Sequence, residues 1–189
     1  AWTRWTRTEG LPNDFVIAIS PSRAPDGRSG VWVGTDGGGV ARVSEGVDQV
    51  FDVQSGLSAT AAVYALLETT TADGVSALWI GMRNGGLARL RRHGWKSIVL
   101  RDARARLPVS ALLETTDPQG NPRYWFGTDG GGLFRLDGDG LRRVEGPGAP
   151  LSNTVIRCLL ARGVPGREEI WVGTRNHGLL RFAAGRWQT

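Results

Sequence analysis

The sequence predicts an all-β protein, a β-propeller built from four four-stranded antiparallel blades. Two observations support this prediction: a tryptophan motif recurs at a fixed period, and each period contains several short segments suited to strands. The tryptophans that mark the repeats are Trp32, Trp79, Trp125 and Trp171. Their spacings of 47, 46 and 46 residues are close to the roughly 40–50 residues of a propeller blade. We therefore expect residues 1–189 to form a single propeller unit of four repeats.

Each repeat divides into four expected strands. The tryptophan strand is followed by a glycine-rich turn such as Asp36-Gly37, since tight hairpins need the positive φ angles that glycine adopts. One apolar segment precedes the tryptophan strand, and two follow the turn. The expected first strands are 15–20, 63–68, 109–113 and 155–160, the third strand of the first repeat is 40–43, and the expected fourth strands are 47–53, 95–100 and 141–145. Helical spacing is absent, and a leucine-rich horseshoe would need repeats of about 20–29 residues.

The four repeat tryptophans are expected to be structural. One large ring at a fixed place on the second strand can pack against the neighbouring sheet and bury about 150–250 Å². Stacking of a ligand on these rings is the alternative. The lone cysteine, Cys158, lies in an apolar segment and is expected to be a buried core thiol; a single cysteine excludes an internal disulfide.

The two ends of the chain leave the number of blades open. Trp5 precedes Gly10 by five residues, as Phe51 precedes Gly56, so the N-terminal segment is expected to be a fourth strand without its own first three. Residues 185–189 begin a fourth strand and overlap residues 1–4 in phase. The chain is therefore a closed four-blade ring, a segment of a longer array, or half of a homodimer that completes a larger, eight-blade propeller.

The charge pattern argues against nucleic-acid binding. The net charge of +5 comes from 23 Lys and Arg against 18 Asp and Glu, whereas nucleic-acid binders cluster positive charge on one face or helix. Four arginines instead occupy one repeat position each, and we expect this charge to be solvated surface; they are Arg42, Arg89, Arg135 and Arg181. No stretch approaches the roughly 20 apolar residues of a membrane-spanning helix, so no direct membrane insertion is expected of this segment.

The sequence offers few groups for catalysis. Its two histidines, His93 and His177, lack metal-ligand spacing, and no G-x-S-x-G elbow presents a nucleophilic serine. The Asp-Gly-Gly-Gly segments at residues 36 and 129 lack the G-K-[ST] ending of a phosphate-binding loop. We therefore expect no enzyme activity, no metal and no cofactor.

Topology suggests where a binding site would lie. Strands within a blade are antiparallel, so the loop entering strand one and the hairpin joining strands two and three emerge on the same face. Polar residues of both loop sets should meet there, in a concave site. The candidate ligand-binding residues on the hairpins are Asp36, Arg83, Asn84, Asp129, Arg175, Asn176 and His177. Acidic hairpins alternate with basic ones, which indicates either tolerated turn variation with loose ion pairs or a surface for a ligand or partner.

The repeat resembles that of the two-component regulator propeller family. The motif [LIV]-W-[IVF]-G-T-x-x-G-G-L-x-R-[LF] recurs four times in register, and G-L-[PS] segments precede it at Gly10 and Gly56. The resemblance covers essentially the whole chain. Its departures are Met82 in place of threonine, His177 in place of the first glycine of its pair, and a shortened G-L-P segment in the third copy.

This resemblance implies a function in signalling. Such repeats build the extracytoplasmic sensor propellers of bacterial hybrid histidine kinases and some diguanylate cyclases, usually with more than four blades. It therefore implies a non-catalytic, periplasmic or extracytoplasmic segment of a membrane receptor that binds a small molecule, a glycan or a partner domain. A structural or oligomerisation scaffold is the first alternative. A propeller lyase or hydrolase is the second, and it would require His177 beside a carboxylate such as Asp129 or Asp36.

Overall fold

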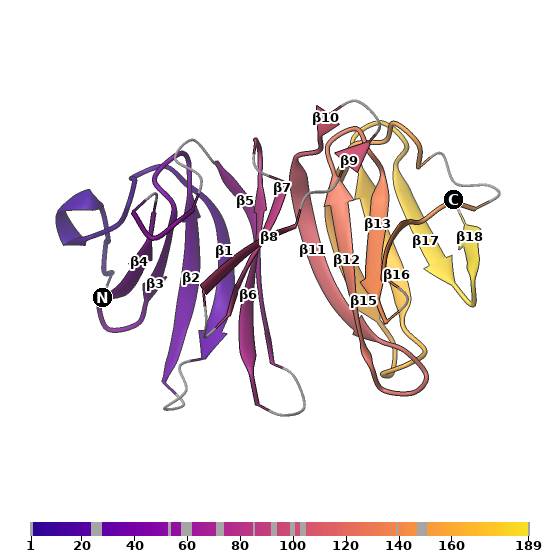
Figure 1. The fold of residues 1–189 in the computed structure, drawn as a ribbon, viewed down its shortest axis with the longest axis horizontal. Coiled ribbons are helices and arrows are strands. Elements are labelled where there is room, and N and C mark those ends of the chain that lie inside the picture. Colours follow the sequence, from indigo (N-terminus) through magenta and orange to yellow (C-terminus); the bar gives the residue numbers. More distant parts are fainter. Residues whose placement is uncertain are drawn as a thin grey trace. The chain divides into compact units, whose positions relative to one another are not determined.

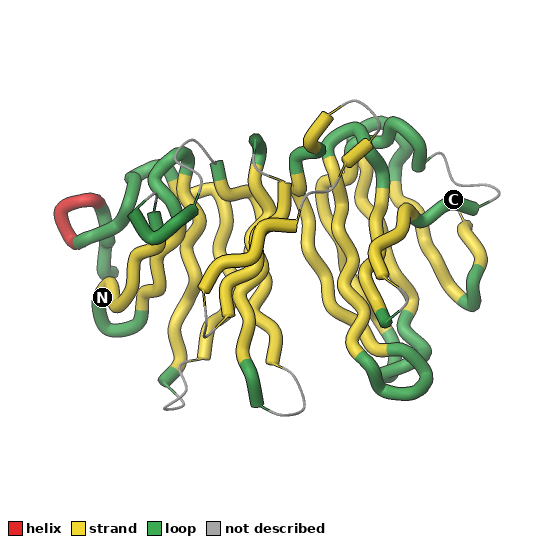
Figure 2. The backbone as a smooth tube through the Cα atoms, in the orientation of Figure 1, coloured by secondary structure: helices red, strands yellow, loops and turns green. Residues whose placement is uncertain are grey.

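In the residues that the computed structural model describes, β-strands are joined by loops, and one short helix precedes the first strand (Figure 1). The residues it describes are 2–23, 28–52, 54–57, 62–70, 74–84, 86–91, 94–98, 101–102, 105–138, 140–146 and 151–188. Figure 2 shows the strands in yellow, the loops and turns in green, and the 3₁₀ helix η1 (Arg7–Glu9) in red. Within these residues no helix has the length and apolar character needed to cross a membrane. The chain divides into two compact units, residues 1–100 and 101–189.

The first unit contains two four-stranded antiparallel sheets. In both, the strands follow one another in chain order, as hairpin connections dictate. The first sheet consists of β1 (Val16–Arg23), β2 (Ser29–Thr35), β3 (Val40–Val43) and β4 (Val47–Phe51). The second sheet consists of β5 (Val63–Thr70), β6 (Ser76–Met82), β7 (Gly86–Arg91) and β8 (Gly94–Ile98).

The second unit repeats this arrangement after a short strand pair, β9 (Arg101–Asp102) and β10 (Ala105–Arg106). The third sheet consists of β11 (Val109–Thr116), β12 (Pro122–Thr128), β13 (Leu133–Asp137) and β14 (Gly140–Arg143). The fourth sheet consists of β15 (Ile156–Arg162), β16 (Glu169–Thr174), β17 (Leu179–Ala183) and β18 (Arg186–Gln188). The predicted four four-stranded antiparallel sheets are therefore confirmed.

Equivalent irregularities recur in all four sheets. The pairing of each first strand with its second strand shifts register near the start of the first strand, as at a β-bulge. These shifts fall between Val16 and Ala18, Val63 and Ala65, Val109 and Ala111, and Ile156 and Cys158. The repeat in the sequence is thus a repeat in backbone geometry.

Within each unit, the tryptophan of one sheet packs on the next sheet. Trp32 shares a buried cluster with Leu66 and Ile80 of the second sheet. Trp125 shares another with residues of the fourth sheet, Ile156, Ile170, Val172 and Leu180. The predicted core role is confirmed for Trp32, Trp79 and Trp125, which are buried.

Glycine allows the sheets to approach closely. A Cβ at Gly34 would lie 2.6 Å from Cγ1 of Val63, and a Cβ at Gly127 would lie 2.5 Å from Cγ2 of Ile156. Both distances are below van der Waals contact. The glycine that follows the tryptophan by two residues therefore receives a side chain of the next sheet.

Three expectations need correction. Trp171 is only half-buried and Cys158 is exposed, because both lie on the face of the fourth sheet that no later sheet of its unit covers. Residues 2–6 form no strand, since a strand needs a hydrogen-bonded neighbour. The chain turns there instead into η1, which is capped by reciprocal hydrogen bonds between Thr6 and Glu9. Six of the predicted positions lie outside the described residues: Ala1, Val53, His93, Val99, Leu100 and Thr189.

Candidate functional site

The hairpin that joins the second and third strands has one construction in three sheets. The threonine that ends the second strand donates its hydroxyl to the carbonyl of a glycine four residues later. These bonds join Thr35 to Gly39 at 2.9 Å, Thr128 to Gly132 at 2.6 Å and Thr174 to Gly178 at 2.8 Å. Gly39 and Gly132 have φ angles of 108° and 80°, which favour glycine. In the second sheet Met82 replaces threonine, and its side chain is buried in the core instead.

Each hairpin is also tied to the segment that enters the first strand of its own sheet. The residue after the second strand donates its backbone N–H to a carbonyl in that segment. These bonds join Asp36 to Phe15 at 3.0 Å, Arg83 to Ala62 at 2.9 Å, Asp129 to Pro108 at 3.0 Å, and Arg175 to Val155 at 2.9 Å. The two loops therefore lie at the same end of every sheet, and the concave site expected from their polar residues stays a prediction.

In the first unit the hairpins present exposed polar side chains. Asn13 donates from Nδ2 to the carbonyl of Asp36 at 2.8 Å and accepts the backbone N–H of Phe15 at 2.9 Å. Asp36, Arg83 and Asn84 are exposed. In this described part of the unit, Asp36 and Arg83 form no ion pair with each other. Hydrogen bonds fix the backbones of these hairpins, whereas the charged side chains at their tips are exposed to solvent.

In the second unit, Asp129 is half-buried, whereas Arg175, Asn176 and His177 are exposed. His177 lies against hydroxyl groups. Its Nδ1 is 3.4 Å from Oγ1 of Thr154, and its backbone N–H donates to Oγ1 of Thr174 at 2.9 Å. Among the described residues of the whole chain, no three His, Cys, Asp or Glu side chains are grouped to hold a metal ion.

The repeat arginines lie on the tryptophans, which the sequence interpretation missed. The arginine of each third strand is directly opposite the tryptophan of the second strand. The guanidinium carbon lies over the ring in three sheets, at 5.0 Å for Arg89 on Trp79, 5.8 Å for Arg135 on Trp125 and 5.6 Å for Arg181 on Trp171. This geometry is that of a cation–π contact.

Arg42 shows most clearly that these charges are not solvated surface. It is 5% exposed and donates to Oγ of Ser22 at 3.0 Å and to the carbonyl of Arg28 at 3.0 Å. It also forms an ion pair with Asp48. The signal was present in the sequence: tryptophan and arginine are ten residues apart in every repeat, which places them opposite each other across the hairpin.

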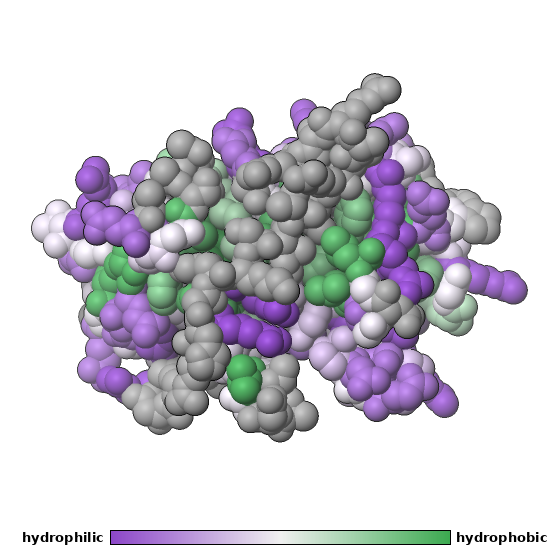
Figure 3. Space-filling view, in the orientation of Figure 1, coloured by the Kyte–Doolittle hydropathy of each residue, from purple (hydrophilic) through white to green (hydrophobic). Residues whose placement is uncertain are grey.

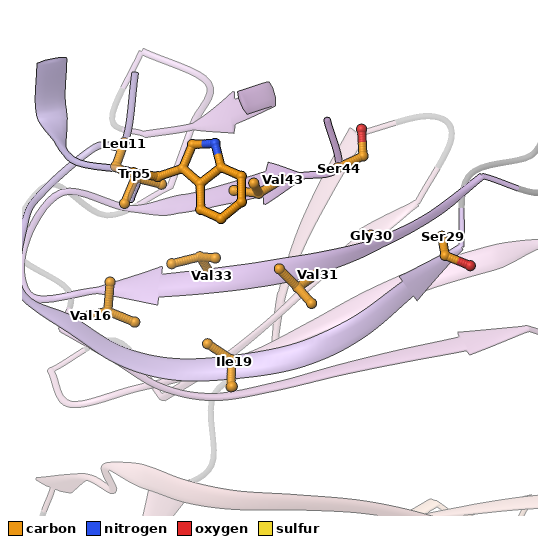
Figure 4. Close-up of a pocket in the computed structure, with 10 residues that line it drawn as sticks. All are labelled: Trp5, Leu11, Val16, Ile19, Ser29, Gly30, Val31, Val33, Val43 and Ser44. Atoms are coloured by element: carbon orange, nitrogen blue, oxygen red, sulfur yellow. The ribbon is translucent and has the colours of Figure 1, made fainter. Parts of the chain in front are cut away.

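A second feature missed from the sequence is an apolar pocket of about 600 Å³ on the first sheet (Figure 4). Its lining residues are Trp5, Leu11, Val16, Ile19, Ser29, Gly30, Val31, Val33, Val43 and Ser44. Trp5 packs against the small cluster of Leu11, Val33 and Val43. Figure 3 shows apolar side chains, in green, open to solvent beside this sheet. The sequence did indicate this surface, because the second strand of the first repeat carries apolar residues on both of its faces. That pattern is typical of a strand that is covered on both sides.

The chain resembles solved propeller structures. No protein-family model matches it, and no curated protein matches it in sequence. It is similar to the extracellular domain of the hybrid two-component system BT3049 from B. thetaiotaomicron, with a TM-score of 0.64 and 20% identity over 96% of this chain and 23% of that one. It is also similar to BBS1N, solved in complex with ARL6DN, with a TM-score of 0.62 and 11% identity over 91% of this chain and 52% of that one.

The chain thus spans less than a quarter of the first structure and about half of the second. At these identities a likeness carries the fold alone. Together with the four sheets, it shows that the chain is built of β-propeller blades.

Proposed function

We propose that the chain is a non-catalytic sensor segment of a bacterial signal-transduction receptor, placed outside the cytoplasm, whose hairpins bind a polar ligand. The repeat resemblance and the likeness to an extracellular domain of a hybrid two-component system support this role. The observation that carries the proposal is the set of exposed charged hairpin tips on hydrogen-bonded backbones. Rigid scaffolds that present polar loops are a common basis for recognition.

The chemistry of the hairpins suggests the class of ligand. Arg175, Asn176 and His177 offer guanidinium, amide and imidazole groups to solvent, and Arg83 and Asn84 offer a similar pair. A guanidinium donates five N–H groups in a planar fork that matches carboxylates. A small carboxylate-bearing molecule, an acidic glycan or an acidic patch of a partner domain would satisfy these groups.

Thermal unfolding with added ligands tests the proposal. A panel of small dicarboxylates and acidic sugars is screened against the wild type and against Arg175→Ala. A ligand that binds at the hairpins raises the melting temperature of the wild type, and the rise is lost in Arg175→Ala. Arg167→Ala is the matched control, because Arg167 is also exposed but lies in the loop between β15 and β16. Equal shifts in all three proteins would contradict the proposal.

Contacts of His177 support the absence of catalysis in this proposal. The lyase or hydrolase alternative requires His177 beside a carboxylate. Nδ1 of His177 instead lies 3.4 Å from Oγ1 of Thr154, and its backbone N–H donates to Oγ1 of Thr174. Turnover of a candidate substrate by the wild type, abolished in His177→Ala, would overturn the non-catalytic assignment and favour a lyase or hydrolase.

A scaffold role is the second candidate, and the apolar pocket on the first sheet favours it. An exposed apolar surface of this kind marks a protein–protein contact. In a pure scaffold, the hairpin variants would leave signalling by the receptor unchanged, whereas substitutions in the pocket would abolish it.

A further inference from the structure

Two hairpins of the second unit meet at one residue, Val155, in the segment that enters β15. Val155 is opposite Asp129 in an isolated antiparallel bridge. Its carbonyl also accepts the backbone N–H of Arg175 at 2.9 Å. Asp129 follows β12 and belongs to the hairpin of the third sheet, whereas Arg175 follows β16 and belongs to the hairpin of the fourth. The backbone at Val155 therefore connects an acidic hairpin to a basic one.

This pairing places three side chains in one row. Residues directly opposite each other in antiparallel segments carry their side chains on the same face. Ile156 is opposite Thr174, so the next pair in this register is Val155 and Arg175. The row therefore presents a carboxylate, an isopropyl group and a guanidinium, in that order. Adjacent backbone segments are about 4.7–4.9 Å apart, so the Cα atoms of Asp129 and Arg175 are roughly 10 Å apart.

The backbone that carries the row is fixed by hydrogen bonds and close packing. Gly132 donates its backbone N–H to the carbonyl of Thr154 at 3.2 Å, and Thr154 donates its own to the carbonyl of Leu151 at 3.2 Å. A Cβ at Gly132 would lie 2.2 Å from the carbonyl oxygen of Leu151. Thr154 is 1% exposed, and its Oγ1 is 3.4 Å from Nδ1 of His177. A ligand would therefore meet a site whose backbone is already ordered.

The two charges of the row do not neutralise each other. Among the described residues of this unit, the ion pairs of Asp137 and of Glu169 are made with arginines of the paired strands, and Asp129 forms none with Arg175. Asp129 and Val155 are half-buried, so the carboxylate and the apolar group beside it are partly shielded from water and partly accessible. Electrostatic attraction is stronger at such a position than in bulk water.

We propose that this row binds a small zwitterion in which a short methylene chain separates an ammonium group from a carboxylate. The ammonium group pairs with Asp129, and the methylene chain lies on Val155. The ligand carboxylate accepts N–H groups of Arg175, whose planar fork matches its geometry. This inference rests on the proposed ligand-binding role of the hairpins and narrows it, because the ligand must carry a positive charge as well as a negative one.

Calorimetric titration of the full chain at pH 7 tests the ligand class. The probes are glycine, 4-aminobutanoate and 6-aminohexanoate, each compared with its N-acetyl derivative, which lacks the ammonium group, and with its amide, which lacks the carboxylate. We expect at least one amino acid to bind, and both of its derivatives to bind about tenfold more weakly or less, as the loss of a charged hydrogen bond requires. If only dicarboxylates bind, or if an N-acetyl derivative binds as well as its parent, this inference is overturned and the proposed function stands. If no ligand of either kind binds, both are overturned.

Two substitutions assign the charges of the ligand to the residues of the row. Asp129→Asn should abolish the preference for the amino acid over its N-acetyl derivative, and Arg175→Ala should abolish the preference over the amide. The matched controls are Glu145→Gln and Arg167→Ala, at exposed positions elsewhere in the same unit, and both preferences should persist in them. Circular dichroism verifies that each variant is folded. A purely structural effect would weaken all ligands in parallel, so unchanged preferences in Asp129→Asn would overturn the inference.

Discussion

Arg135 lies over the indole ring of Trp125, with its guanidinium carbon 5.8 Å from the ring centroid. The two residues face each other across β12 and β13. Asp137 approaches Nε of Arg135 at 2.7 Å, and the indole N–H of Trp125 donates to Oγ1 of Thr115 at 2.8 Å. The indole N–H is thus hydrogen-bonded and the charge of Arg135 is paired with Asp137, while the apolar area of the ring is buried against the next sheet.

Replacing Trp125 with alanine should lower the free energy of unfolding by about 3–5 kcal/mol, because a large buried ring leaves a cavity. The measurement is urea unfolding followed by circular dichroism. Trp2→Ala is the control, since Trp2 is fully exposed, and it should change stability by no more than about 0.5 kcal/mol. Similar losses in the two variants would contradict the core role of Trp125.

The hairpin threonines make a smaller contribution. Thr128 is buried and donates to the carbonyl of Gly132 at 2.6 Å. Thr128→Val should destabilise the protein by about 0.5–1.5 kcal/mol, the net value of one hydrogen bond. Thr3→Val, at an exposed position, should have no measurable effect in the same unfolding experiment. An unchanged Thr128→Val would show that the hydroxyl does not hold the turn.

Glu114 should make stability depend on pH. Burial raises the pKa of its carboxyl above the ordinary value of 4.5, against a smaller opposing effect of the Tyr124 hydrogen bond. The folded state therefore holds this proton more tightly than the unfolded state, and stability is lost as the pH rises through the two pKa values. Glu114→Gln should raise the melting temperature at pH 7 and not at pH 3. The control is Glu45→Gln, at an exposed position, which should have the same effect on the melting temperature at pH 7 and at pH 3. A rise in the melting temperature of Glu114→Gln at pH 3 would contradict the burial effect.

The sequence was sufficient to predict the architecture because each repeat carries several residues at fixed positions. In every repeat the tryptophan is followed by a glycine two residues later and by an arginine ten residues later, and the repeats recur every 46 or 47 residues. Within each repeat, the alternation of apolar and polar residues predicts strands. The loop pairing could be predicted for the same reason, since antiparallel order alone brings the ends of strands together.

Burial could not be predicted in the same way. Trp125 and Trp171 occupy equivalent positions, yet only Trp125 is buried, because burial depends on the sheet that covers each face. Cys158 was expected to be buried and is exposed for the same reason. We expected Arg42 to be solvated because charged side chains are rarely buried. Its position opposite Trp32 in the paired strands buries it instead.

The local contacts of the candidate site were also beyond prediction. The approach of His177 to Thr154 depends on side-chain rotamers and on a loop bend 23 residues away in the sequence. Residues 2–6 resembled a fourth strand in spacing, but spacing cannot supply the neighbouring strand that such a strand would need.

Side chains of one sheet enter the glycine hollows of the sheet before it, and the stacking of blades depends on this contact. A double-mutant cycle on Gly127 and Ile156 tests it most directly. Gly127→Ala should destabilise by about 1–3 kcal/mol through overpacking, and Ile156→Ala by about 2–5 kcal/mol through a cavity. Gly138→Ala, with no atom within 4 Å of its Cβ position, is the control.

In the double variant the new methyl at residue 127 enters the space vacated at residue 156. We predict that the two losses do not add, and that the interaction free energy is about 0.5–3 kcal/mol in favour of the pair. Strictly additive losses would contradict the stacking of tryptophan-bearing sheets on which the propeller assignment depends.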